Sequence, residues 1–218
     1  MTEQDTAEPR NPGAAYDSAE IECYALIRAA NDPDRLTEAV ADGLHSLAQR
    51  HPGETSEDFR IHLGGALVWI SSVFLFFAAR HARLHADGPE RKKGADYAAA
   101  KPLILGLANT ADQRHPDATP VQRDAYRRAL ALFHFALTEA SEENPLSGRF
   151  CHHWLSIQHI HGPGADYALL TALATASRDL ASFAAVARGI TLDELLRGHQ
   201  MNAMETQEWE RAEESYLY

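Results

Sequence analysis

Apolar residues recur along much of the chain at intervals of three and four, which is the spacing of one face of an α-helix. In residues 33–50 this stripe comprises Leu36, Val40, Leu44 and Leu47. Together with helix caps and breakers, such stripes predict helices that begin near residues 17, 33, 55, 102, 119, 145, 166 and 191. The pattern therefore predicts an all-α fold of about seven or eight helices.

Residues typical of helix starts stand before several stripes. Asp32 precedes Pro33, which places a cap before a proline at the first helical position. Thr119 is followed three residues later by a glutamine, and Thr191 is followed three residues later by Glu194. Both pairs have the spacing of a capping box, so we expect well-defined helix starts at these positions.

The first stripe begins after an acidic, proline-bearing stretch. Residues 1–15 are expected to be a disordered tail, and residues 16–218 are expected to be a single helical domain. A cap at Asp17 predicts a first helix that runs to about Ala30. We expect a loop over residues 109–118.

The longest expected helix runs from about Thr55 to Leu84 and is the most apolar part of the chain. The only ionisable residue between Arg60 and Arg80 is His62, and residues 64–79 are apolar on almost every side. A helix of this kind must be buried.

Two environments could bury this helix. A bilayer span needs about 20 apolar residues, and residues 61–79 approach that length only by including His62, Ser71 and Ser72. The other expected helices carry apolar stripes that need a partner, which favours burial inside the bundle or across a homodimer. We therefore expect a bundle around a long apolar central helix, without membrane insertion.

Composition agrees with a helical core. The chain has 38 alanines against 5 valines and 8 isoleucines, a balance that favours helices over sheets. Trp69 and Trp154 are interpreted as core aromatics, and the stripe of residues 166–188 is expected to point Leu169 and Phe183 inward.

The chain is acidic, with a formal net charge of -11. This charge repels phosphate backbones and disfavours general nucleic-acid binding. Cys23 and Cys151 form no metal-binding cysteine motif, and residues 1–15 lack the pattern of a signal peptide. We expect reduced thiols and a cytoplasmic location, and the excess of arginine over lysine suggests a bacterial source.

The candidate catalytic residues lie at the end of the apolar helix. Arg80 precedes His85 by five residues, a spacing used by small helical ribonucleases of the HEPN group, in which arginine stabilises phosphorane charge and histidine transfers a proton. The same kind of spacing recurs ahead of His134, as chance predicts for a chain with this many arginines. His81 and His85 stand at the separation that can chelate one metal ion, but Arg80 opposes a cation there.

A second group of histidines lies between Cys151 and His161. On a helix, His152 and His159 share a face but are separated by about 10 Å along the axis, too far to bind one ion together. No Glu-x-x-His sequence of a di-iron bundle occurs in the chain. We therefore predict no cofactor, and whether this group binds anything is left open.

The last expected helix suggests a contact with another protein. Its apolar residues form a stripe edged by glutamates, and the candidate interaction residues are Met201, Met204, Trp209 and Leu217. The leading hypothesis is a non-enzymatic, homodimeric binding or regulatory protein that acts through protein–protein contacts. The alternative is a small helical enzyme, either a HEPN-like ribonuclease that uses Arg80 and His85 or a metal-dependent enzyme that uses His81 and His85.

Overall fold

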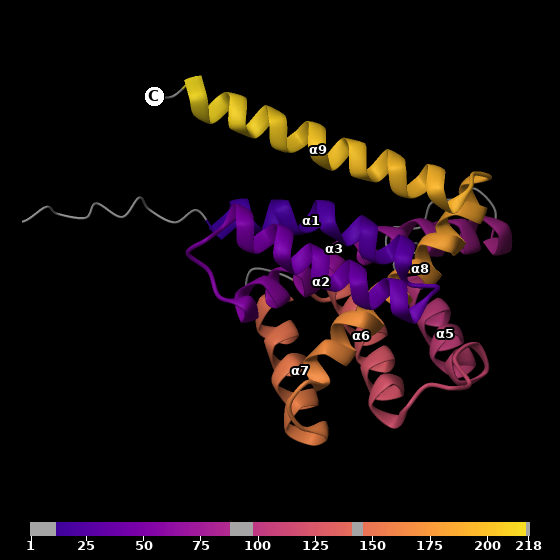
Figure 1. The fold of residues 1–218 in the computed structure, drawn as a ribbon. Coiled ribbons are helices and arrows are strands. Elements are labelled where there is room, and N and C mark those ends of the chain that lie inside the picture. The colour runs from indigo at the N-terminus through magenta and orange to yellow at the C-terminus, as the bar shows by residue number, and fades with distance from the viewer. Residues whose placement is uncertain (1–11, 88–97, 141–145, 217–218) are drawn as a thin grey trace, which may run out of the picture.

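The computed structural model describes residues 12–87, 98–140 and 146–216, and it describes no strand in these ranges (Figure 1). The expected all-α fold is confirmed. The helices of the described ranges are α1 (Pro12–Ala29), α2 (Pro33–Arg50), α3 (Ser56–Asp87), α5 (Ala100–Arg114), α6 (Pro120–Thr138), α7 (Leu146–His161), α8 (Ala165–Arg188) and α9 (Leu192–Tyr216).

Helix α3 is the centre of the bundle. It contacts α1, α2, α5, α6, α7 and α8, and its contact with α8 is the most extensive of all the helix pairs. Figure 1 shows α9 on the outside of the bundle, where it runs along α1. Helices α5, α6 and α7 lie on the opposite side of the molecule. Helices of its own chain thus cover much, but not all, of the long apolar helix.

Local capping explains the three best-defined helix starts. The Asp32 carboxylate accepts hydrogen bonds from two backbone N–H groups of α2, at 3.1 and 3.3 Å. Thr119 and Gln122 form a reciprocal capping box at α6. Thr191 and Glu194 exchange equivalent hydrogen bonds at α9, with the Thr191 N–H 2.8 Å from the carboxylate. These starts are the ones that the sequence predicts.

Two helix boundaries differ from expectation. Helix α1 begins at Pro12, so the cap expected at Asp17 is wrong, because proline at the first position and the alanines after it favour an earlier start. Helix α5 continues to Arg114 through much of the expected loop. Buried Leu107 and Ala111 extend its apolar stripe, and this packing outweighs the polar residues between them.

The core has α3 at its middle. Leu63, Leu67, Phe74 and Leu75 have no exposed surface. Ser71 donates a hydrogen bond to the Leu67 carbonyl at 2.6 Å, so its hydroxyl is satisfied without water.

Two aromatic residues expected in the core are not buried. Trp69 is 50% exposed and Phe183 is 45% exposed, whereas Trp154 and Leu169 are buried as expected. Helix α3 is apolar on almost every side, so its sequence does not specify which side the neighbouring helices leave uncovered.

In the part of the chain that the structure describes, two helical segments are long and apolar enough to cross a bilayer, Ser56–Arg83 and Ala165–Arg188. In each, 61% of the most apolar window is buried inside the bundle. Core helices of soluble proteins meet the same length and hydropathy criteria, so this is weak evidence for a membrane span.

Candidate functional site

Helix α9 has two different faces. Leu195 and Leu196 are buried against the bundle, whereas Met201 is 54% exposed and Met204 is 46% exposed. Residues three apart lie on the same side of a helix, so the two methionines form one exposed apolar surface, which we call the α9 outer face.

An aromatic contact holds the inner side of α9 on the central helix. The His199 ring lies edge-on against Phe74, with ring centroids 5.3 Å apart, and 6.3 Å from the centroid of Phe77. The guanidinium group of Arg188 lies over the Phe77 ring, 5.6 Å from the ring centroid. Burial and the Arg188 charge lower the pKa of His199, which favours the neutral ring in this contact.

The sequence predicted a single apolar stripe on α9, and the structure divides it. Leu195 and Met201 are six positions apart, which places them on different sides of a helix. Their burial differs accordingly, at 1% and 54% exposed. The side chain of Trp209 and all of Leu217 lie outside the described part of the chain, so their role stays a prediction.

The candidate enzyme residues lie at the end of α3. Arg80 and His81 are partly buried, and the side chain of His85 is outside the described part of the chain. The ribonuclease pair and the chelating pair both include His85, so both remain predictions. Among the side chains that the structure describes, no group of three or more His, Cys, Asp or Glu residues could hold a metal ion.

A polar network joins α6 to α7 near the second histidine group. Asp124 accepts hydrogen bonds from Arg128 Nε at 2.9 Å and lies 3.0 Å from His161 Nε2. Arg128 also donates to the Ser156 hydroxyl at 3.2 Å. Burial raises the pKa of Asp124, but the hydrogen bonds from Arg128 and His161 outweigh burial and hold it below its ordinary value. The network ties two helices together and includes one of the predicted histidines.

His153 lies beside this network and is expected to make stability depend on pH. Burial, followed by the charges of Arg128 and Arg149, lowers the pKa of His153 to about 4. The unfolded chain takes up this proton near pH 6.5, so the stabilising effect of a neutral His153 is present above that pH and is lost as the pH falls toward 4.

Chemical denaturation between pH 7.5 and 4.5 measures this effect. Because His153 is only partly buried, we expect His153→Gln to remove roughly 1 kcal/mol of the acid-induced loss of unfolding free energy. His159→Gln, which changes an exposed histidine of the same helix, serves as the control. Identical profiles of unfolding free energy against pH for the wild type and His153→Gln would show that His153 is not the source of the pH dependence.

A second polar contact links α6, α8 and the loop after α5. The Tyr126 hydroxyl donates to Asp179 at 2.6 Å, and His115 Nε2 lies 3.9 Å from the same carboxylate oxygen. The Tyr126 side chain is almost completely buried. Its partner is 53 residues away in the chain, so no local pattern identifies the pair.

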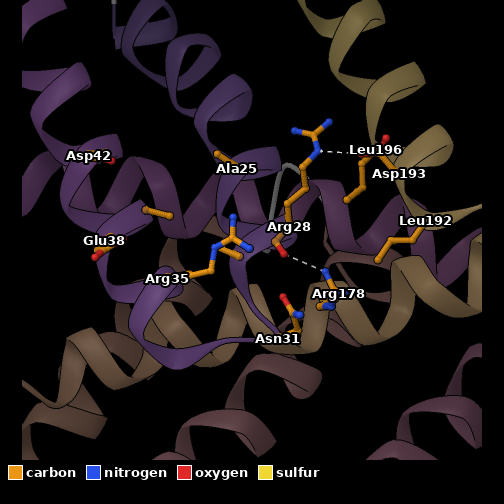
Figure 2. A pocket seen from close by; sticks show the side chains of 12 residues that line it. Ala25, Arg28, Asn31, Arg35, Glu38, Asp42, Arg178, Leu192, Asp193 and Leu196 are labelled. Atoms are coloured by element: carbon orange, nitrogen blue, oxygen red, sulfur yellow. Dashed lines mark hydrogen bonds and ion pairs between the residues drawn. The ribbon is translucent and has the colours of Figure 1, made fainter.

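A hollow of about 640 Å³ lies where α1, α2, α8 and α9 meet. Figure 2 shows the arginines Arg28, Arg35 and Arg178 in its middle, each from a different helix. Glu38 and Asp42 line another part of the same hollow, on α2. No sequence pattern marks this hollow, because its residues are dispersed along the chain and form no motif.

Comparisons with known proteins do not add a function to this geometry. No family model, no curated protein and no solved structure matches the chain.

Proposed function

We propose that the protein is a non-enzymatic binding or regulatory protein that acts through protein–protein contacts made by the α9 outer face. The observation that supports this proposal is the pair of exposed methionines, Met201 and Met204, on a helix whose other side is fixed by buried leucines. Methionine is flexible and polarisable, and it adapts to irregular apolar surfaces of binding partners.

The charge around this face suggests the chemistry of the partner. Glu205 and Glu208 follow Met201 by four and seven residues, the spacing of one helix face. A partner with an apolar groove and a basic rim would complement this pattern. Two copies of this face would instead bring like charges together, so the proposed homodimer would form through a different surface.

The partly exposed side of α3 is the better candidate for that homodimer. Trp69 is half exposed, and between Arg60 and Arg80 the helix contains no charged residue other than a histidine. An apolar surface without charge allows two acidic chains to meet without repulsion at the contact. A cytoplasmic location is part of the same proposal, since reduced thiols and partner binding both suit it.

Two matched double variants test the binding proposal. Met201→Ser with Met204→Ser changes the α9 outer face, and Leu155→Ser with Ile160→Ser changes two exposed apolar residues of α7. The protein that copurifies with the wild type is identified, purified and titrated against each variant. We expect the α9 variant to bind about tenfold more weakly and the α7 variant to bind like the wild type.

Equal affinities for the two variants would contradict the proposal, as would a copurifying protein that is equally abundant with both. Light scattering on the same samples reports self-association. We expect both variants to keep the oligomeric state of the wild type, because the proposed homodimer does not use either surface. A loss of the dimer in the α9 variant alone would assign that face to self-association instead.

A further inference from the structure

The hollow at the junction of α1, α2, α8 and α9 has one wall with separated charges. Arg35, Glu38 and Asp42 lie on α2 and all line the hollow. Glu38 is about 4.5 Å and Asp42 about 10 Å from Arg35 along the helix axis, at 1.5 Å per residue. Among the described residues none of the three has an ion-pair partner. One positive and two negative side chains are therefore available to a ligand.

Two arginines from other helices, Arg28 of α1 and Arg178 of α8, also line the hollow. Arg178 donates hydrogen bonds to the carbonyls of Ile27 at 3.3 Å and Arg28 at 3.0 Å, so the fold holds its guanidinium group in place. The Arg28 side chain lies across the hollow and contacts Asp193 at 3.5 Å. Arginines held in this way bind carboxylate and other oxyanions through charge-assisted hydrogen bonds.

Apart from Asn31 and Asp193, the rest of the lining is apolar. The apolar residues are Ala25, Ala29, Ala39, Leu192 and Leu196. A volume of about 640 Å³ is within the range of small-molecule sites. The lining therefore suits a short hydrocarbon segment between two charged groups.

We propose that this hollow binds a small zwitterionic ligand, such as an ω-amino carboxylic acid or a short peptide. Its anionic group lies near Arg35 with Arg28 and Arg178, and its ammonium group lies toward Glu38 and Asp42. A purely anionic ligand would bring a negative group close to the two carboxylates without neutralising them. A zwitterion satisfies both ends of the wall, and this inference does not depend on the partner proposed for α9.

Four probes of graded charge test the proposal by isothermal titration calorimetry at constant ionic strength. They are 6-aminohexanoate, hexanoate, hexylamine and glycine. The first has both charges on an extended chain, and the next two have one charge each. Glycine has both charges too close together to reach from Arg35 to Asp42, about 10 Å along the helix axis. We expect 6-aminohexanoate to bind about tenfold more tightly than each of the other three.

Two variants assign the ends of the ligand. Arg35→Gln is expected to weaken 6-aminohexanoate binding to the level of hexylamine, and Glu38→Gln with Asp42→Asn is expected to weaken it to the level of hexanoate. Arg127→Gln and Asp117→Asn change exposed charges elsewhere and should leave binding unchanged. Circular dichroism of each variant confirms that the helical fold is retained.

Three results would overturn the proposal. They are 6-aminohexanoate binding that does not saturate, equal affinities for the four probes, and equal affinities of Arg35→Gln and Arg127→Gln for 6-aminohexanoate. A preference for hexanoate over 6-aminohexanoate would instead identify the hollow as a simple anion site.

Discussion

Replacement of Arg60 by alanine is expected to lower the free energy of unfolding by about 2 to 3 kcal/mol. Arg60 Nη1 lies 2.9 Å from Asp166 Oδ2, and the Asp166 side chain is only 4% exposed. The substitution removes the cation and leaves a buried carboxylate without its partner. Asp166 is the second residue of α8, so the free N–H groups at that helix start offset part of the loss.

Urea denaturation of a small set of variants measures this effect. Arg127→Ala, an exposed arginine of α6, is the control and should change the unfolding free energy by less than about 0.5 kcal/mol. The double variant Arg60→Ala with Asp166→Ala should be more stable than Arg60→Ala alone, because it removes the unpaired charge. A double variant that is less stable by the sum of the two single effects would contradict this explanation.

The second large effect is expected at Gly64, where α3 lies close to α7. A Cβ atom at this position would lie 2.8 Å from Phe150 Cε2 and closer still to Cζ of the same ring. Phe150 is buried, with 2% of its surface exposed, so the ring has little room to move. Gly64→Ala is therefore expected to destabilise the protein by about 2 kcal/mol, even though alanine favours helices.

A glycine in another helix provides the matched control. A Cβ atom at Gly106 of α5 would have no neighbour within 4 Å. Gly106→Ala is therefore expected to stabilise the protein by up to about 1 kcal/mol, through helix propensity alone. In thermal unfolding, the midpoint of Gly64→Ala should fall and that of Gly106→Ala should rise. A stabilising effect of Gly64→Ala would contradict the close approach of α3 to Phe150.

Both expected effects concern contacts between helices that local patterns do not reveal. The sequence alone marked residues 64–79 as the most apolar helix, but it did not identify Gly64 as a point of close approach. It marked Arg60 only as the residue that bounds this segment. The partner of Arg60 is 106 positions further along the chain, and the partner of Gly64 is 86 positions further.

The candidate surfaces were predictable in part. Composition and spacing predict Met201 and Met204 as interaction residues; the structure shows that they are exposed, and their role in binding stays a prediction. The leucines before them were placed in the same stripe, but the structure places them in the core. The position of α9 against α1 and α3 made that distinction, since a helix with several apolar sides buries whichever one faces its neighbours.

The hollow could not be predicted at all. Arg28, Arg35 and Arg178 come from three helices, and nothing in their spacing relates them to one another. Their convergence depends on the crossing positions of α1, α2 and α8, which packing determines.

The amino-acid sequence by itself determined the helical class, most helix starts and the identity of the central helix. These properties follow from the periodicity of apolar residues and from capping interactions, which act within a few residues. Only the tertiary structure decided that Trp69 is half exposed, that Arg60 pairs with Asp166 and that three arginines share one hollow. These features depend on the rotation and crossing of helices that are distant in the chain, where packing selects one arrangement among many that satisfy the same local pattern.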